Sequence, residues 1–338
     1  MIVEMRTGAT KKEINDVVQK AKSLDLGVQL NLGTDKCVVA ILGSNTGQIP
    51  TEMFAVLPGV ESVTRIMKPY KLASRNFKPK DTVVRCSGVE IGGQRIAVIA
   101  GPCAVESEKQ LMEAAAIVKK AGATILRGGA FKPRTSPFSF QGLQIKGLEL
   151  LAKARNEYGM PVITEVVNTE DVDLVASYAD MLQIGSRNMQ NFSLLTSAGK
   201  SKRPVVLKRG FSCTLTEWLT AADYLLAEGD DQVILCERGI RTFEDSIRFS
   251  MDISSIPVVK KNSHLPIIVD PSHSAGHYSL VPAIAKAAVA AGADGLLIEV
   301  HPNPKEALVD GLQSLSPSDF TRLMEELKVI AKAVGRYI

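Results

Sequence analysis

Four side chains of the kinds that bind transition metals follow stretches of sequence that favour β-strand. They are one cysteine, one histidine and two acids, namely Cys103, His273, Glu299 and Asp310. A thiolate, an imidazole and carboxylates together suit one divalent ion such as Mn, Fe, Co, Zn or Cu, and these residue types do not choose among the metals. The alternative is structural, because a cysteine near a strand end is often a small core residue and a strand-end glutamate can pair with a lysine.

A group of basic side chains also stands in or just after apolar stretches. It comprises Arg127, Lys132, Arg134, Arg187, Lys208, Arg209 and Arg238. Such a run of charged residues is usually part of a solvent-exposed face. Here, however, the cations lie next to apolar strands, where unpaired charges are costly to bury. Converging cations need anions, and the forked donors of arginine match phosphate and carboxylate groups. Because this group exceeds what one phosphate monoester needs, we predict a doubly anionic substrate or two phosphorylated substrates.

Lys208 by itself permits a different chemistry. A lysine at the end of a barrel strand can form a Schiff base with a substrate carbonyl, as in lysine-dependent aldolases. That reaction needs no metal and leaves Cys103 and His273 without a role, whereas a metal-dependent reaction uses both groups.

The order of the predicted elements explains how these side chains could meet. From residue 95 onward strands alternate with helices, and the strands are predicted at 96–100, 124–127, 161–166, 181–184, 204–207, 232–236, 266–269 and 295–300. Helices are predicted between them, for example at 107–121, 147–158, 215–227, 280–291 and 318–334. Eight such units over about 240 residues are typical of an α/β fold of the (β/α)8 TIM-barrel type. An open doubly wound sheet is the competing fold, but no Gly-x-Gly-x-x-Gly follows the first strand.

Closure of the barrel would bring the potential metal ligands and the basic side chains together at one end of the barrel. Active sites of such barrels lie at the carboxyl ends of the strands. The first, seventh and eighth strands are neighbours in a closed barrel, since the eighth pairs with the first. The four potential metal ligands would therefore converge there, and the basic side chains of the other strands would face them.

The first seventy residues follow a different pattern. Strands are predicted at 1–6, 28–32, 36–42 and 62–67. An amphipathic helix is predicted at 10–24, where Thr10 is the expected N-cap, and a second short helix at 50–57. The order β-α-β-β-α-β is that of a small ferredoxin-like α+β domain. We therefore predict a ferredoxin-like domain over residues 1–68, a linker over 69–81, and a barrel domain over 82–338 that begins with a hairpin.

Composition bounds the class of protein. The chain has 338 residues, and its 40 basic and 36 acidic residues give a net charge of +4, which does not indicate nucleic-acid binding. The N-terminus lacks a signal-peptide pattern and no apolar run is long enough for a membrane span, so we expect neither secretion nor membrane insertion. The five scattered cysteines include no Cys-x-x-Cys, which favours the reducing cytoplasm.

The motifs at the predicted strand ends resemble those of a known family. They are Ala-Gly-Pro-Cys at 100–103, Leu-Arg-Gly-Gly at 126–129, Lys-Pro-Arg-Thr-Ser-Pro at 132–137, Gln-Ile-Gly at 183–185, Leu-Lys-Arg-Gly at 207–210, Glu-Arg-Gly at 237–239 and Asp-Pro-Ser-His-Ser at 270–274. In this order they resemble 3-deoxy-D-arabino-heptulosonate 7-phosphate (DAHP) synthase, the enzyme that enters the shikimate pathway of aromatic amino acid biosynthesis. The small domain resembles the ferredoxin-like regulatory domain of some members.

The resemblance implies a reaction and a role for each candidate residue. The reaction is the condensation of phosphoenolpyruvate with erythrose 4-phosphate, assisted by one divalent metal ion on Cys103, His273, Glu299 and Asp310. The residues implied to bind phosphoenolpyruvate are Arg127, Lys132, Arg187, Lys208 and Arg238, with a backbone amide of Ser186, and those implied to bind the aldose phosphate are Arg134 and Thr135. Lys132 is our candidate for protonating the developing alkoxide, and Glu165 for positioning the attacking water, although Glu165 could instead be a buried counter-ion.

Three alternatives and two further expectations accompany this resemblance. The sister family, 3-deoxy-D-manno-octulosonate 8-phosphate synthase, takes arabinose 5-phosphate, but its loop typically reads Lys-Ala-Asn-Arg-Ser where this chain has Lys-Pro-Arg-Thr-Ser at 132–136. A Schiff-base aldolase and a metabolite sensor that has lost catalysis are the others. The resemblance also implies feedback inhibition by Tyr or Phe at the small domain, and a homotetramer would fit it.

Overall fold

The computed structural model describes residues 1–338 except 34–35, 44, 66–68, 134–135, 137 and 230. The chain folds into two compact units, one of residues 1–81 with 262–264 and one of residues 82–261 with 265–338. Among the described residues, no helix is both long and apolar enough to cross a membrane.

The larger unit is built on a closed parallel barrel. Within the described part of the chain its strands are β7 (Ala97–Gly101), β8 (Ile125–Arg127), β9 (Val162–Glu165), β10 (Met181–Ile184), β11 (Val205–Lys208), β12 (Val233–Glu237), β13 (Ile267–Val269) and β14 (Gly295–Glu299). They follow one another around the barrel in chain order, and β14 closes it against β7, from Gly295 opposite Ala97 to Glu299 opposite Gly101. The predicted TIM barrel is confirmed.

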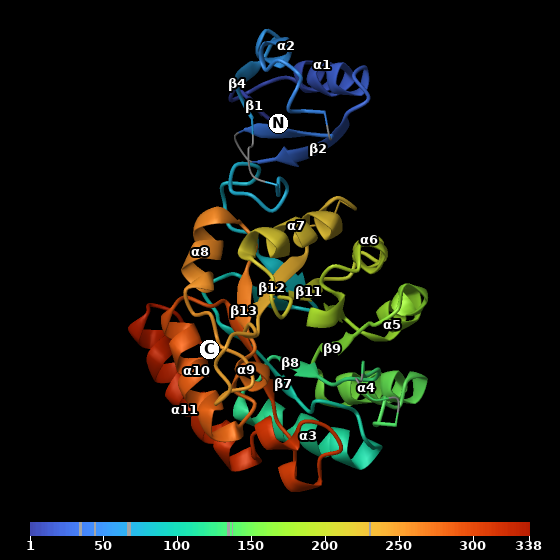
Figure 1. The fold of residues 1–338 in the computed structure, drawn as a ribbon, viewed down its shortest axis with the longest axis vertical. Coiled ribbons are helices and arrows are strands. Elements are labelled where there is room, and N and C mark those ends of the chain that lie inside the picture. The colour runs from blue at the N-terminus through green and yellow to red at the C-terminus, as the bar shows by residue number, and fades with distance from the viewer. Residues whose placement is uncertain (34–35, 44, 66–68, 134–135, 137, 230) are drawn as a thin grey trace. The chain divides into compact units, whose positions relative to one another are not determined.

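Helices alternate with the strands of the barrel, and most of them lie outside it in Figure 1. They are α3 (Glu108–Ala121), α4 (Ile145–Tyr158), α5 (Val172–Tyr178), α6 (Phe192–Lys200), α7 (Leu215–Leu226), α8 (Ser255–Asn262), α9 (Pro271–Ala275), α10 (Val281–Ala290) and α11 (Pro317–Ala333), with short 3-10 helices η1 (Thr169–Asp171), η2 (Ser186–Asn188), η3 (Tyr278–Leu280), η4 (Pro304–Glu306) and η5 (Gly311–Gln313). Local signals set their ends. Ser107 caps the start of α3, and Gly122, with φ of 99°, ends it in the left-handed conformation that glycine adopts without strain.

A hairpin packs against the side of the barrel core where the strands begin. Its strands are β5 (Val84–Cys86) and β6 (Val89–Ile91), which pair antiparallel. Val84 and Ile91 are fully buried in the same apolar cluster as Ala97 and Ile125, the first residues of β7 and β8. The other end of the barrel, where the strands finish, is therefore the end available for chemistry.

The smaller unit has the predicted ferredoxin-like fold. Its elements are β1 (Ile2–Met5), α1 (Lys11–Lys22), β2 (Gly27–Leu32), β3 (Cys37–Leu42), α2 (Glu52–Ala55) and β4 (Val60–Thr64), and the antiparallel sheet has the order β2-β3-β1-β4. Thr10 caps α1 in a capping box with Glu13, as expected. In the segment predicted as a linker, Ser74 and Ser263 form an isolated antiparallel β-bridge, and the Arg75 N–H donates to the carbonyl of Asn262 at 3.0 Å.

Candidate active site

The four potential metal ligands converge at the carboxyl ends of three neighbouring strands. Cys103 follows β7, His273 lies in α9 after β13, Glu299 is the last residue of β14, and Asp310 lies in the loop beyond it. Their ligand atoms all lie within 4.8 Å of one another. Barrel closure produces this cluster, since β13, β14 and β7 are consecutive around the barrel.

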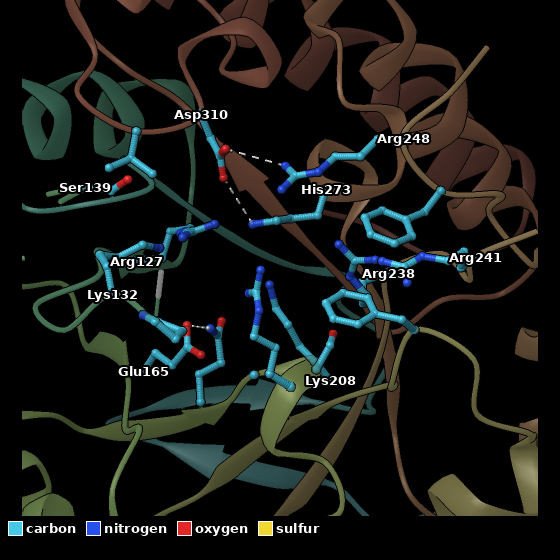
Figure 2. A pocket seen from close by; sticks show the side chains of 18 of the residues that line it. Arg127, Lys132, Ser139, Glu165, Lys208, Arg238, Arg241, Arg248, His273 and Asp310 are labelled. Carbon is cyan, nitrogen blue, oxygen red and sulfur yellow. Dashed lines mark hydrogen bonds and ion pairs between the residues drawn. The ribbon is translucent and has the colours of Figure 1, made fainter. Parts of the chain in front are cut away.

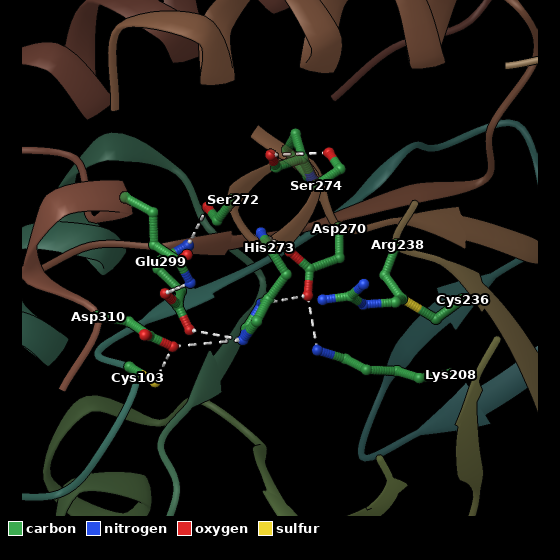
Figure 3. A network of polar contacts seen from close by, with 12 residues as sticks. Cys103, Lys208, Cys236, Arg238, Asp270, Ser272, His273, Ser274, Glu299 and Asp310 are labelled. Atoms are coloured by element: carbon green, nitrogen blue, oxygen red, sulfur yellow. Dashed lines mark hydrogen bonds and ion pairs between the residues drawn. The ribbon is translucent and has the colours of Figure 1, made fainter. Parts of the chain in front are cut away.

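The spacing of these atoms suits one metal ion. Cys103 Sγ lies 3.5 Å from Asp310 Oδ2, and His273 Nε2 lies 3.5 Å from Glu299 Oε1 and 3.8 Å from Asp310 Oδ2 (Figure 3). Ligands bound at about 2.0–2.3 Å to one tetrahedral ion stand roughly 3.3–3.8 Å apart. One thiol, one imidazole and two carboxylates at these separations therefore fit a divalent transition metal.

Asp270 orients the histidine. Its Oδ1 accepts a hydrogen bond from the backbone N–H of His273 at 2.9 Å, and its Oδ2 lies 2.7 Å from His273 Nδ1. The second contact is close but out of line, so Nδ1 makes no well-directed hydrogen bond. The ring nevertheless turns Nε2 toward Glu299 and Asp310. Burial lowers the pKa of His273 although Asp270 opposes this, which favours the neutral imidazole that metals bind.

The charges of the cluster depend on burial and on nearby cations. Burial raises the pKa of the Cys103 thiol and Glu299 raises it further, while Lys132 opposes the rise. Burial also raises the pKa of Glu299, but His273 and Arg127 outweigh this effect and lower that pKa to about 2. Glu299 is therefore a carboxylate at neutral pH, whereas Cys103 needs a cation to become a thiolate.

A cavity of about 590 Å³ opens in front of the cluster. Among the described residues that line it, the cations are Arg127, Lys132, Arg187, Lys208, Arg238, Arg241 and Arg248. Glu165 and Asp310 are the lining acids, and Ser186, which begins η2, also lines it. Figure 2 shows the labelled cations around the cavity, with Asp310 and His273 on its metal-ligand side. Such a surplus of positive charge suits small anions with several charges.

Most of the predicted substrate-binding residues lie in this lining. Arg127, Lys132, Ser186, Arg187, Lys208, Arg238 and Glu165 do so. Arg134 and Thr135, predicted for the aldose phosphate, lie outside the described residues.

The inclusion of Arg209 among the convergent cations was wrong. Its guanidinium is buried against Glu237 at 2.7 Å and Asp252 at 2.9 Å and does not line the cavity. Consecutive residues along an extended chain point to opposite sides, so Lys208 and Arg209 cannot both face the barrel axis. This alternation is visible in the sequence and could have excluded Arg209.

Sequence reasoning missed Arg241, Arg248, Phe211 and Phe249, which also line the cavity. Both arginines and Phe249 lie in the long loop after β12, several residues beyond the strand end, and Phe211 lies in the loop after β11. The clustering of arginines in one loop that follows a barrel strand was the available signal.

Two cations lie between the metal-ligand cluster and the cavity. Arg127 donates to Glu299 Oε1 at 2.9 Å, and Lys132 Nζ lies 3.2 Å from Cys103 Sγ and 3.1 Å from its carbonyl oxygen. Burial lowers the pKa of Lys132, but Cys103 and Glu165 outweigh this effect and raise it. Lys132 therefore carries a proton next to the place where a substrate oxygen would approach the cluster.

Glu165 faces the cavity from the end of β9. Its Oε2 accepts a hydrogen bond from Gln183 at 3.2 Å. Gly185 packs directly against it, because a side-chain carbon at this position would lie 2.1 Å from Glu165 Oε1. The carboxylate is thus fixed by Gln183 on the adjacent strand β10 and by Gly185, which directly follows that strand.

Fold and cavity together define a (β/α)8-barrel enzyme that has a cation-lined site for small anions next to a set of potential metal ligands. Comparison with known proteins identifies the family. The model of the DAHP synthetase I family matches residues 81–334, and that of the DAHP synthase ferredoxin-like domain matches residues 1–68. The chain belongs to the DAHP synthase family, as its motifs predicted.

Individual relatives agree with this assignment. A phospho-2-dehydro-3-deoxyheptonate aldolase of Thermotoga maritima is 49% identical over 335 residues, which cover 99% of each chain. The crystal structure of a DAHP synthase from that organism has a TM-score of 0.80 at 48% identity, covering 99% of this chain and 98% of the other. A 2-dehydro-3-deoxyphosphooctonate aldolase of Citrifermentans bemidjiense is 30% identical over 272 residues, 75% of this chain and 98% of the relative.

Proposed function

We propose that the protein condenses phosphoenolpyruvate with erythrose 4-phosphate to give DAHP and inorganic phosphate. The observation that carries this proposal is the cluster of four ligand atoms within 4.8 Å, which faces a cavity lined by cations. One site thus offers a place for a carbonyl next to a Lewis acid and enough positive charge for two phosphorylated substrates.

Cys103, His273, Glu299 and Asp310 would hold one divalent ion, and the chemistry it supplies when bound is polarisation of the aldose aldehyde. Asp270 keeps His273 turned toward that position, and Arg127 does the same for Glu299. The protein's own contribution here is a set of ligands held in place before the substrates arrive.

The remaining residues bind the substrates and move protons. Phosphoenolpyruvate would lie against Arg127, Lys132, Arg187, Lys208 and Arg238, with a backbone amide of Ser186, while Arg134 and Thr135 would bind the aldose phosphate. The C3 carbon of phosphoenolpyruvate forms a bond to the aldehyde carbon, and Lys132 gives its proton to the resulting alkoxide. Water positioned by Glu165 adds to C2 and returns one proton to Lys132. Phosphate then leaves by cleavage of its bond to that carbon and takes the proton of the new hydroxyl group as the C2 ketone forms.

The environment of Lys208 disfavours the Schiff-base alternative. Its ammonium group is buried 2.6 Å from Asp270 Oδ2. A Schiff base requires a nitrogen that is free to approach a carbonyl carbon, whereas Lys208 Nζ is held in this contact with Asp270. Lys208 is thus better suited to bind an anion than to attack a carbonyl.

The choice of aldose is tested by measuring the reaction with each aldose phosphate separately. We expect kcat/KM for erythrose 4-phosphate to exceed that for arabinose 5-phosphate, measured as loss of phosphoenolpyruvate absorbance. Faster turnover of arabinose 5-phosphate would assign the protein the reaction of its 30%-identical relatives. Binding of both substrates without turnover would favour the sensor hypothesis.

Replacing Gly185 by alanine is expected to lower kcat about 10- to 100-fold, because the added methyl group displaces the Glu165 carboxylate. The matched control is Gly93→Ala, where the new methyl carbon would meet only Glu90 Oε2 at 3.7 Å. Steady-state kinetics of both variants check the prediction. A G185A enzyme with unchanged kcat would remove Glu165 from the mechanism.

We also propose that residues 1–68 form a regulatory domain that responds to Tyr or Phe, followed by a linker over 69–81, in a cytoplasmic homotetramer. Deleting residues 1–68 is expected to leave kcat within about twofold and to abolish inhibition by either amino acid. A truncated DAHP synthase from Thermotoga maritima that covers 80% of this chain supports the feasibility of this variant. A full-length protein that neither amino acid inhibits would contradict the regulatory role.

A further inference from the structure

Arg238 is buried beside the cavity without an acidic partner. Only 3% of its surface is exposed, and among the described residues no carboxylate lies within ion-pair distance of its guanidinium. Glu237, its neighbour, pairs with Arg209 and also accepts hydrogen bonds from the backbone N–H groups of Arg238 and Gly239. Burial lowers the pKa of Arg238 to about 10, although Asp270, which lies beyond ion-pair distance, opposes this effect.

Aromatic rings stand where a counter-ion would be expected. The guanidinium of Arg238 lies 3.9 Å from the ring centre of Phe249 and 5.0 Å from that of Phe211. The two rings stack on each other with their centres 5.2 Å apart and their planes within 9°. They come from different loops, after β12 and after β11, so the pair links two neighbouring sectors of the barrel.

The same pair of rings contacts three more arginines. Arg187 and Arg241 lie 5.5 and 5.7 Å from the centre of Phe211, and Arg248 lies 5.9 Å from that of Phe249. All these arginines line the cavity, and Figure 2 shows Arg238, Arg241 and Arg248 on the same side of it. The two rings thus lie among four cations, of which Arg248 also pairs with Asp310 at 3.5 Å and donates to Gln313 at 2.6 Å.

A ring and a carboxylate hold a guanidinium in different ways. The face of an aromatic ring attracts the cation through its quadrupole but accepts none of its in-plane N–H bonds. A carboxylate would occupy those donors and would add a negative charge that repels an anionic substrate. Apart from the bond from Arg238 Nη1 to the Gly239 carbonyl oxygen at 3.3 Å, support by aromatic rings thus leaves the donors and the charge of Arg238 available to the cavity.

We propose that Phe249 and Phe211 are positioning residues that hold Arg238, with Arg187 and Arg241, ready for a phosphate-bearing anion in place of an acidic partner. The proposal deepens the proposed function, since it concerns how the same cavity binds phosphoenolpyruvate.

The backbone fixes Phe249 in this role. Its N–H donates to the carbonyl of Ser274 at 3.0 Å, in the segment that carries His273, and Ile240 and Ser250 bridge the two sides of its loop. Gly239, with φ of 87°, permits the close turn, because a side-chain carbon there would lie 2.8 Å from Phe249 Cβ. The ring is therefore held from two sides.

The test compares Phe249→Leu, which removes the ring, with Phe249→Tyr, which keeps it. For F249L we expect KM for phosphoenolpyruvate to rise about tenfold with kcat within about twofold, and for F249Y values near those of the wild type. The control is Phe192→Leu, which removes a ring from an exposed stack with Tyr224 and should change neither parameter.

Thermal unfolding of each variant separates a loss of stability from a loss of binding. If F249L does not fold, the partly exposed Phe211, as F211L, carries the same prediction.

Calorimetric titration with phosphoenolpyruvate alone separates a failure of the aromatic support for Arg238 from a failure of the proposed condensation reaction. If F249L turns over with an unchanged KM, or if F249Y is as impaired as F249L, the aromatic support is wrong and the proposed function stands. If the wild type binds phosphoenolpyruvate without turnover and F249L binds it about tenfold more weakly, the proposed function is wrong and the aromatic support stands.

Discussion

Replacing Cys103 by alanine is expected to lower kcat/KM by about 1,000-fold or more, because the variant loses one of the four side chains that we propose bind a single ion. The substitution removes the thiol and leaves the buried carboxylate of Glu299 with His273 and Asp310. The measurement is steady-state kinetics together with the metal content of the dialysed protein. We expect metal content and activity to fall together.

Cys213→Ala is the matched control for C103A. Cys213 lies in the same unit of the protein and is partly buried, but it is not among the clustered ligands. Its variant should retain metal and keep kcat/KM within about twofold. A C103A protein that binds metal as the wild type does and remains fully active would show that the cluster is structural.

Replacing Lys132 by methionine is expected to lower kcat by about 1,000-fold, within the range that general acid catalysis contributes. The Lys132 ammonium lies 3.2 Å from Cys103 Sγ and lines the cavity, so it is placed to protonate an oxygen bound at the cluster. Methionine keeps the length and apolar body of the side chain and removes its proton and charge. The control is Lys146→Met, an exposed lysine on α4, which should change kcat by less than about twofold.

Added amines separate a chemical role of Lys132 from a structural one. If Lys132 is the proton donor, a small primary alkylamine in the assay should restore part of the K132M rate, with a pH dependence that follows the amine. If the rate does not respond to any amine, and K132M differs from the wild type only in KM for phosphoenolpyruvate, the lysine binds substrate but does not donate the proton.

The barrel and the metal-ligand cluster could be predicted because repeating patterns determine them. Alternating strands and helices define the closure of the barrel, and closure alone brings residues as distant as Cys103 and Glu299 onto adjacent strands. Positions at the strand ends, such as Arg127, Glu165 and Lys208, follow from the same regularity.

The rest of the site depends on loops, which have no repeating pattern. Arg248 and Phe249 reach the cavity through the conformation of one long loop, and the loop fixes that conformation through contacts such as the bond from Phe249 to Ser274. No spacing rule in the sequence predicts such contacts. The error over Arg209 has another origin. All basic residues at a strand end were taken to face the cavity, although side chains alternate between the two sides of an extended chain.

We propose that this protein condenses phosphoenolpyruvate with an aldose phosphate through an ion held by Cys103, His273, Glu299 and Asp310. The most direct test follows the loss of phosphoenolpyruvate with erythrose 4-phosphate before exhaustive chelation, after it, and after one divalent metal at a time is returned. We predict that chelation abolishes turnover and that at least one of Mn, Fe, Co, Zn or Cu restores it. Full turnover after exhaustive chelation, or trapping of substrate on Lys208 by borohydride, would contradict the claim.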